Sequence, residues 1–233
     1  METKQKTLGM SGNTLKIIAM LAMTIDHIGL MLFPDVILLR VLGRLAMPVF
    51  AWMIAEGCTY TKNRFRYFFA VFGVGLLCQT VYLLFMQSLN QCILITFSMS
   101  LLLIYTMDYA ERKKNFLSLC LMGLVFFGVC YICVFLPGDL PGTDFRVDYG
   151  IFGVMLPVVI YIAKTKEQKL MAAAGVLAML AIWNGFIQWF ALLALPLIAL
   201  YNGQRGKAKL KYLFYMYYPL HLAAIYGISV LLR

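Results

Sequence analysis

Charged residues are scarce in this chain: they make up 13% of its 233 residues, against about 25% in an ordinary soluble domain. Hydrophobic residues make up 63%, and long apolar runs recur from end to end, each close to the ~20 residues that cross a bilayer as a helix. This composition excludes a soluble enzyme. It predicts an all-α polytopic membrane protein in which residues 1–233 form a single integral membrane domain.

Several catalytic signatures are also missing. The chain contains no P-loop, no dinucleotide-binding glycine fingerprint, no G-x-S-x-G and no H-E-x-x-H. Its six cysteines include one C-x-x-C pair, Cys130 and Cys133, without the second pair that a four-cysteine zinc site needs. We therefore expect these two thiols to be small apolar packing residues, and we expect no metal.

Acidic residues are few: 10 stand against 20 Lys and Arg, for a formal net charge of +10. The positive groups lie mainly in short loops between apolar runs, which indicates membrane orientation and not nucleic-acid binding. The basic segments are the N-terminus, 56–66, 108–115, 164–169 and 202–211. The alternate loops, apart from Arg146, are neutral or acidic: 34–35, 88–90, 137–146 and 185–186. This alternation predicts a cytoplasmic N-terminus and an external C-terminus.

About nine transmembrane helices, with eight to ten as the range, are expected from the apolar runs. They cover 15–33, 36–55, 67–87, 91–107, 116–136, 147–163, 170–184, 187–201 and 212–232. The stretch 170–201 has one turn signal, at Asn184-Gly185, and is either two short crossings, which we favour, or a re-entrant hairpin. Prolines inside the spans predict kinks around an internal cavity: Pro48, Pro157, Pro196 and Pro219.

An ionisable pair, Asp26-His27, lies inside the first apolar run, and Arg40 and Arg44 lie inside the second. Charge at membrane depth is costly, by about 2.5 to over 10 kcal/mol per group. At about 1.5 Å per residue, Asp26, His27 and Arg44 reach the same depth in the outer half of the membrane, with Arg40 one turn further out. Two structural alternatives remain: Asp26 simply neutralises Arg44, and Arg40 is an interfacial anchor.

The neighbouring carboxylate gives His27 a chemical interpretation. Beside Asp26, the imidazole would be held in one tautomer and made more basic, as in a general base. His221, in the last span, is either a second functional histidine or a satisfied interhelical hydrogen bonder. Tyr217 lies one turn before it.

Other polar residues lie at the ends of the spans. Lys16 shares a helical face with His27. It is either a ligand contact or an anchor at the inner surface of the membrane. The turn Tyr201-Asn-Gly-Gln-Arg-Gly206, followed by Lys207, is either an ordinary loop or a site for a phosphorylated cytosolic ligand. Polar residues at the ends of other spans are Glu56, Asp148 and Tyr149.

These residues occur in stretches that resemble the TraX family. The matching stretches follow one another in the family's order: Leu15-Lys-Ile-Ile-Ala-Met, Ile25-Asp-His-Ile-Gly29, Gly43-Arg-Leu-Ala-Met-Pro-Val-Phe-Ala51, Ile54-Ala-Glu-Gly57, Asp148-Tyr-Gly150, Ala194-Leu-Pro-Leu-Ile198, Tyr201-Asn-Gly203 and Tyr215-Met-Tyr-Tyr-Pro-Leu-His-Leu222. The resemblance covers nearly the whole chain, and its specificity comes from the set of stretches together.

The resemblance implies a multi-span membrane acyltransferase of the bacterial cytoplasmic membrane. TraX proteins resemble a larger superfamily in which a basic residue and a first-helix histidine, separated by ten residues, are a functional signature; Lys16 and His27 fit it, with lysine in place of the usual arginine. The founding activity, N-terminal acetylation of a conjugative pilin, implies acetyl-CoA as donor. Relatives acylate other acceptors, so a pilin, a glycan and a wall polymer all remain open.

The resulting hypothesis is acyl transfer from cytosolic acyl-CoA to an external amine or hydroxyl. His27, oriented by Asp26, is the base; Arg44 or Tyr217 stabilises the oxyanion; His221 is a second acid or base or takes a transient acyl group. The expected donor-binding residues are Lys16, Asn202, Arg205 and Lys207, and the expected acceptor-binding residues are Arg40, Glu56, Asp148 and Tyr149. The alternatives are a proton-coupled small-solute transporter that uses Asp26, His27 and Arg44, and a non-catalytic scaffold.

Overall fold

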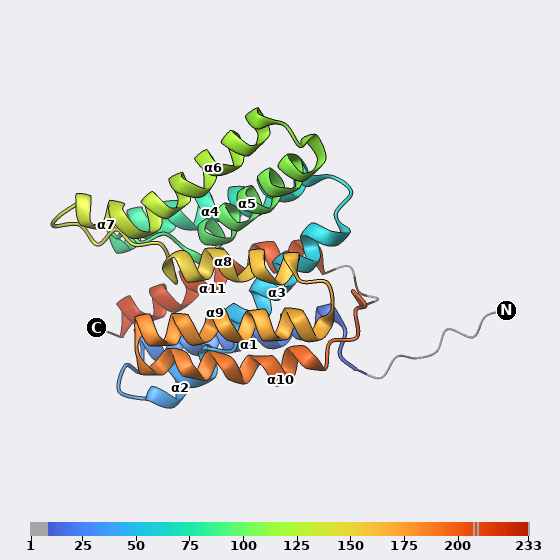
Figure 1. Ribbon diagram of the computed structural model, residues 1–233. Coiled ribbons are helices and arrows are strands. Elements are labelled where there is room, and N and C mark those ends of the chain that lie inside the picture. Colours follow the sequence, from blue (N-terminus) through green and yellow to red (C-terminus); the bar gives the residue numbers. More distant parts are fainter. Residues whose placement is uncertain (1–8, 207, 209, 233) are drawn as a thin grey trace.

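The computed structural model describes residues 9–206, 208 and 210–232, and this part of the chain is helical almost throughout (Figure 1). Nine helical rods follow one another in it. They are α1 (Gly12–Met31), α2 (Ile37–Gly43) continued by α3 (Ala46–Tyr60), α4 (Arg64–Met86), α5 (Ile93–Lys113), α6 (Phe116–Cys130) continued by the π-helix η1 (Tyr131–Phe135) and α7 (Leu136–Asp139), α8 (Gly150–Ile162), α9 (Lys166–Asn184), the 3-10 helix η2 (Phe186–Leu193) continued by α10 (Ala194–Ala199), and α11 (Lys211–Leu231).

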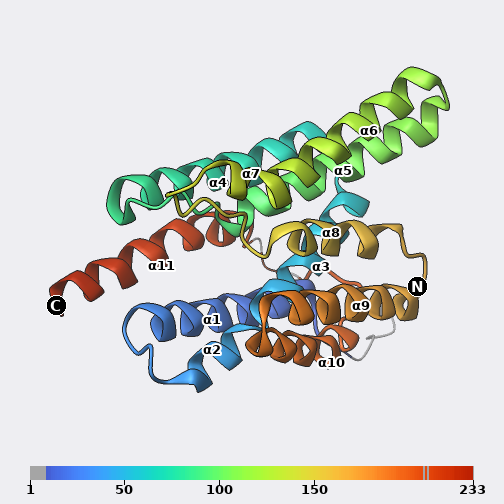
Figure 2. The same ribbon diagram turned by 60° about the vertical axis from the view of Figure 1, so that its left-hand side comes forward.

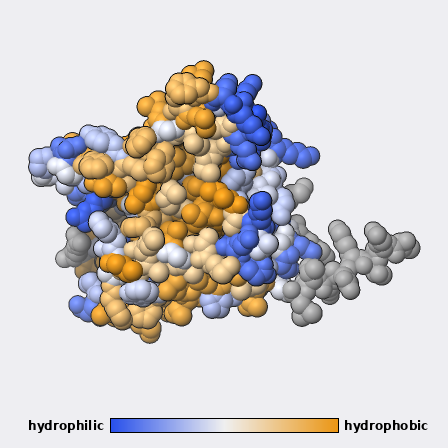
Figure 3. All heavy atoms as spheres, in the orientation of Figure 1, coloured by the Kyte–Doolittle hydropathy of each residue, from blue (hydrophilic) through white to orange (hydrophobic). Residues whose placement is uncertain are grey.

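Each of the nine predicted spans coincides with one rod, which confirms the all-α polytopic membrane architecture. Six rods are long and apolar enough to cross a membrane: 12–31, 37–60, 64–86, 93–113, 116–139 and 213–231. The rods at 150–162 and 186–199 are shorter apolar helices. Large apolar side chains face outward over much of the molecule (Figure 3), as a lipid-facing surface requires.

Four helices begin with a side-chain cap. Ser11, Asn63, Asn115 and Thr165 each accept a hydrogen bond from a backbone N–H in the first turn of the helix that follows. Thr165 forms a complete capping box with Gln168. These residues satisfy N–H groups that have no intrahelical partner.

All four caps lie at the same end of the bundle. Figure 1 shows the links α3–α4, α5–α6, α8–α9 and α10–α11 on the right, together with the start of α1. Hydrophilic residues gather at this end in the space-filling view (Figure 3). We call it the basic end, because its loops carry the predicted basic segments. The opposite end, which we call the far end, carries residues 32–36, 87–92, 140–149 and 185.

The core centres on α3, which packs against α1, α5, α8 and α10. Trp52 of α3 is 1% exposed, and it shares the core with Leu15, Phe97 and Leu156. The rod of α6, η1 and α7 lies at the periphery; in it only Ser118 and Val129 are buried. Figure 2 shows this rod, with α4 and α5, on the opposite side of the bundle from α9 and α10.

The second rod breaks at Arg44 and Leu45, between α2 and α3. Pro48 explains the break, because a proline has no N–H for the carbonyl four residues earlier, which is that of Arg44, and its ring clashes with that carbonyl. Pro196 lies in the first turn of α10, directly after the 3-10 segment η2. At Pro157 and Pro219, α8 and α11 each run through their proline as one continuous helix, so neither proline breaks its span.

The stretch 170–201 folds back on itself at Gly185, whose φ of 96° favours glycine. The amine of Lys166, at the start of α9, donates to the carbonyls of Ala199 and Tyr201 (2.5 and 2.8 Å). The start of α9 therefore lies beside the end of α10, at the basic end. A single long helix is excluded.

Candidate active site

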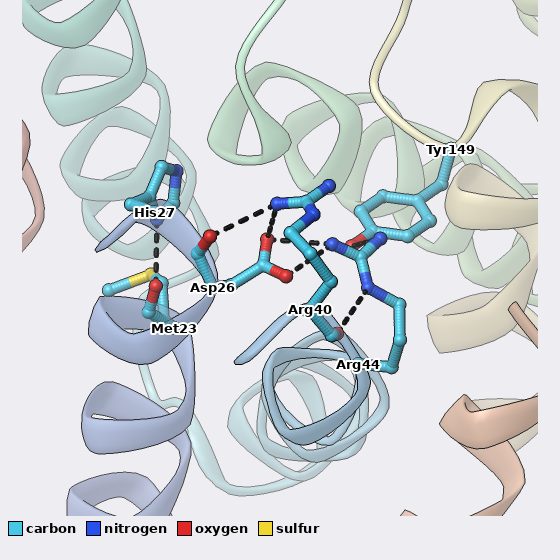
Figure 4. Close-up of polar contacts among 6 residues, drawn as sticks. All are labelled: Met23, Asp26, His27, Arg40, Arg44 and Tyr149. Carbon is cyan, nitrogen blue, oxygen red and sulfur yellow. Dashed lines mark hydrogen bonds and ion pairs between the residues drawn. The ribbon is translucent and has the colours of Figure 1, made fainter. Parts of the chain in front are cut away.

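Asp26 lies at the centre of an ion cluster near the far end (Figure 4). Its carboxylate accepts hydrogen bonds from Arg44 Nη2 at 2.5 and 2.7 Å and from Arg40 Nη1 at 2.8 Å. Arg44 also donates to the Tyr149 hydroxyl (3.2 Å) and, through Nε, to the carbonyl of Arg40 (3.3 Å). The predicted meeting of Asp26 with Arg44 is thus confirmed, and Arg40, which was expected one turn further out, binds the same carboxylate.

Gly43 allows this close approach of α1 and α2. A Cβ atom at position 43 would lie 2.2 Å from Cβ and Oδ1 of Asp26, a separation that no side chain tolerates. The break that Pro48 imposes then places Arg44 just past the end of α2, with its side chain directed at the same carboxylate. Local sequence therefore assembles the cluster from two adjacent rods.

The expectation that Asp26 orients His27 is wrong. Figure 4 shows the two side chains directed away from each other, and the Asp26 carboxylate is bonded to the arginines. His27 Nδ1 lies 2.8 Å from the Met23 carbonyl instead. A carbonyl only accepts, so Nδ1 carries the proton, and the neutral ring presents an unprotonated Nε2. The backbone of α1, not a carboxylate, fixes the tautomer.

The two histidines of the chain lie together. The ring centroids of His27 and His221 are 5.0 Å apart, in an edge-to-face arrangement. His221 repeats the local bond of His27: its Nδ1 lies 2.9 Å from the Tyr217 carbonyl, one turn earlier on α11. Its Nε2 is buried and has no hydrogen-bond partner among the described residues. Two imidazoles of the same tautomer therefore meet between α1 and α11.

Tyr217 stacks on His221, with ring centroids 5.3 Å apart. Its hydroxyl lies 2.6 Å from Thr24 Oγ1, and Thr24 donates its own proton to the Met20 carbonyl (2.9 Å). The Tyr217 hydroxyl must therefore donate to Thr24. This arrangement does not favour the predicted oxyanion role of Tyr217. The nitrogens of Arg44 bind Asp26, Tyr149 and a backbone carbonyl. These bonds likewise do not favour the predicted oxyanion role of Arg44.

A cavity of about 890 Å³ opens beside the cluster. Its lining includes the predicted residues Asp26, His27, Arg40, Arg44, Asp148 and Tyr149. It also includes polar residues that the sequence did not single out as site residues: Tyr82, Gln91, Arg146, Gln188 and Tyr218. Arg146 was noted only as an exception to the loop charges, although its spacing of two from Asp148 places both on one side of an extended segment.

At the basic end, the Lys16 amine lies 5.3 Å from the centre of the Phe214 ring on α11. Lys16 and His27 therefore both face α11, as their spacing predicts. Arg205 lies close enough to Lys16 to act on it electrostatically. Two cations thus lie near each other at this end.

The loop at 201–206 covers the start of α1. The carbonyls of Gln204 and Arg205 accept hydrogen bonds from the N–H groups of Gly12 and Asn13 (2.7 and 2.9 Å). Asn202 is used within the fold: its side chain accepts from the Gln204 N–H (3.0 Å) and donates to the Gly9 carbonyl (3.3 Å). These bonds do not favour the predicted ligand role of Asn202. Lys207 lies outside the described residues.

Glu56 is likewise placed apart from the cavity. Its carboxylate accepts a hydrogen bond from the Lys169 amine at 2.9 Å, and the Tyr201 hydroxyl lies 3.5 Å from it. This buried pair joins α3 to α9 near the basic end. The geometry gives Glu56 a structural ion pair in place of the predicted acceptor contact.

The fold and the site together define a helical membrane protein with an arginine–aspartate cluster and paired histidines beside a cavity. A model of the TraX protein family matches residues 11–229. The chain belongs to the TraX family.

Two curated proteins are similar to this chain. It is 31% identical over 156 residues to an uncharacterised protein of Rickettsia prowazekii (strain Madrid E); the match covers 67% of this chain and 57% of that protein's length. It is 25% identical over 261 aligned positions to a protein of Dichelobacter nodosus described as a probable fimbrial assembly protein, FimC, serogroup H1, covering 98% and 99% of the two chains. No solved structure matches the chain.

Proposed function

We propose that this protein is a membrane acyltransferase that moves an acetyl group from acetyl-CoA at the basic end to an amine or hydroxyl in the cavity. The basic end faces the cytoplasm, and all nine rods cross the bacterial cytoplasmic membrane. Family membership supports the reaction class, because the founding TraX activity is pilin acetylation. The name of the Dichelobacter relative, a fimbrial assembly protein, makes a surface protein one acceptor class, beside a glycan and a wall polymer.

The observation that carries the proposal is the position of His27. His27 lines the cavity, and its Nε2 is unprotonated. Lys16 lies on the same face of α1 at the basic end, about 17 Å away along the helix axis. One line of residues on α1 therefore links a cationic end to a base beside a polar cavity. A scaffold would have no need for this line.

The residues take the following roles. Lys16 and Arg205 bind phosphate groups of the donor, as paired cations do. The acceptor nitrogen or oxygen attacks the thioester carbonyl, its bond to carbon forms, and the carbon–sulfur bond breaks. His27 Nε2 takes the acceptor proton and returns it to the departing thiolate, which leaves as the free thiol of CoA.

The histidine pair and the ion cluster support that step. His221, with its free Nε2 beside His27, is the second group able to hold the proton. Asp26, Arg44 and Tyr149 position α1 against α2 and α8 and do not touch the reacting atoms. The cavity is lined by Met23 on α1 but does not extend to Lys16. Because α11 covers the face of α1 between them, the proposal requires α11 to separate from α1 when the donor enters.

Mass spectrometry of envelope proteins and polymers, with and without the gene, tests the proposal. We expect a set of acetylated amines or hydroxyls to disappear on deletion and to return with the wild-type gene. A transporter predicts the opposite pattern: unchanged acetylation, and solute uptake by proteoliposomes that contain no CoA. That pattern would overturn the proposal.

Lys16→Gln tests the donor site. Removing the amine should raise KM for acetyl-CoA by about tenfold or more, since one charge-assisted contact contributes about 1.5–3 kcal/mol. Lys62→Gln, an exposed lysine at the same end, is the matched control and should leave KM unchanged. Equal KM values in the two variants would remove Lys16 from the donor site.

A further inference from the structure

The far rim of the cavity is a short extended segment, residues 146–148, held in place by backbone bonds. Gln91 donates to the Arg146 carbonyl (2.7 Å) and accepts from the Asp148 N–H (3.1 Å). Val147 is buried, at 5% exposure. Alternate residues of an extended strand point to the same side, so we place Arg146 and Asp148 on one side of the segment; all three residues of the segment line the cavity.

Asp144 anchors the start of this rim. Its carboxylate accepts from the Ser88 hydroxyl (2.5 Å) and from the Leu89 N–H (2.8 Å), and these bonds hold the pKa of Asp144 below its usual range. Arg146 is therefore carried by a fixed segment, although its side chain is exposed.

Two guanidinium groups in the cavity have N–H groups that bind no acceptor in the described part of the chain. Arg40 uses only Nη1, on Asp26, so within the described chain its Nε and Nη2 bind no protein acceptor. Arg146 makes no side-chain hydrogen bond or ion pair to any described residue. By contrast, Arg44 is 5% exposed, and all three of its guanidinium nitrogens donate to protein groups.

The formal charge of the lining favours an anion. Three arginines face two aspartates, which leaves one positive charge with His27 neutral. A phosphate or carboxylate would accept short, charge-assisted hydrogen bonds from the N–H groups of Arg40 and Arg146 that bind no described protein acceptor.

We propose that the acceptor of this enzyme carries a phosphate or carboxylate group close to its reacting amine or hydroxyl, and that Arg146 and the free edge of Arg40 bind this group in the cavity. The inference rests on the proposed acyl transfer and names the chemistry of its acceptor. Arg40 lies between His27 and Tyr149 in Figure 4, so an anion on Arg40 brings a neighbouring amine or hydroxyl toward His27.

Protection of His27 from carbethoxylation by diethyl pyrocarbonate tests this binding without requiring acetyl transfer. The chain has two histidines, and mass spectrometry of the α1 peptide reports His27 alone. In dodecyl maltoside, O-phosphoethanolamine should slow the modification, inorganic phosphate should do so at higher concentration, and ethanolamine should have no effect. Repeating the reaction in phosphatidylethanolamine nanodiscs, without added probe, distinguishes a lipid headgroup from a soluble source.

Arg146→Gln should weaken protection at least about tenfold, the loss expected for one charge-assisted contact. Arg112→Gln, an exposed arginine at the basic end, is the matched control and should protect as the wild type does. The proposal is overturned if ethanolamine protects as well as O-phosphoethanolamine, if neither the phosphate probes nor the lipid protect, or if Arg146→Gln protects normally. Because binding is measured directly, these results are independent of whether acetyl transfer occurs.

Discussion

At the scale of single residues, Asp26 compensates the positive charges of the ion cluster. It is the shared partner of Arg40 and Arg44, and its own side chain is only 14% exposed. Removing one member of a buried ion group leaves the others without compensation, which costs far more than the group contributes as a whole. The cluster is thus a structural requirement that surrounds the proposed chemistry.

Asp26→Asn should therefore destabilise the protein by about 3–5 kcal/mol. Thermal unfolding in detergent measures the change. Asp35→Asn makes the same substitution at an exposed position of the far end and should change the stability by less than about 0.5 kcal/mol. If the two variants unfold at similar temperatures, Asp26 does not compensate the arginines.

Tyr217→Phe separates a structural tyrosine from a catalytic one. The Tyr217 hydroxyl donates to Thr24, so its loss should cost about 0.5–1.5 kcal/mol of stability and lower kcat less than about tenfold. Steady-state acetyl-CoA turnover and thermal unfolding report the two effects. A loss of kcat as large as that in His27→Gln, without destabilisation, would instead place the hydroxyl in the reaction.

The sequence predicted the charged members of the site because charge in an apolar run is costly and therefore conspicuous. It predicted the pairing of Asp26 with Arg44 but not the partner of His27. Met23, which fixes the tautomer of His27, contributes only a backbone carbonyl, and every residue has one. Arg146 was overlooked because it lies in a loop, where a charge is ordinary; only the folded chain, in which residue 91 pairs with residues 146–148, brings it to the lining of the same cavity as Arg40.

At the scale of secondary-structure elements, the contact of α1 with α2 depends on Gly43. Gly43→Ala would place a methyl group 2.2 Å from Asp26, and the helices would have to separate. We expect a loss of about 1–3 kcal/mol, as for other over-packed sites, together with weaker acetyl transfer. Thermal unfolding and turnover measure both.

Gly123→Ala on α6 is the control for that substitution. A Cβ atom there meets nothing within 4 Å, and alanine favours the helix by about 0.5–1 kcal/mol over glycine. Gly123→Ala should therefore be neutral or slightly stabilising. Gly43→Ala with the same stability as Gly123→Ala would contradict the close contact.

Helix positions were predictable because apolar runs and basic loops mark the same boundaries. The break between α2 and α3 was partly predictable, since Pro48 was expected to kink its span. The spans predicted at 147–163 and 212–232 contain Pro157 and Pro219, and α8 and α11 run through these prolines without a break. How far a helix bends at a proline depends on packing against neighbouring elements, which local sequence does not contain.

At the scale of the whole molecule, the structure gathers the basic loops at one end, and the proposed orientation places that end in the cytoplasm. Alkaline phosphatase fused to the C-terminus should therefore be active, and the same reporter inserted at residues 113–115 should be inactive. Cells that express each fusion at equal levels provide the measurement. Activity at 113–115 and none at the C-terminus would reverse the orientation and the direction of transfer.

The central claim is that His27 accepts the proton during acetyl transfer across this membrane protein. The most direct measurement is transfer from acetyl-CoA, supplied at the basic end of liposome-embedded protein, to an envelope acceptor fraction supplied at the far end, with wild-type protein and His27→Gln compared. We predict transfer by the wild type and a rate at least about a hundredfold lower in His27→Gln, at unchanged thermal stability. A folded His27→Gln protein that transfers acetyl groups at nearly the wild-type rate would contradict the account.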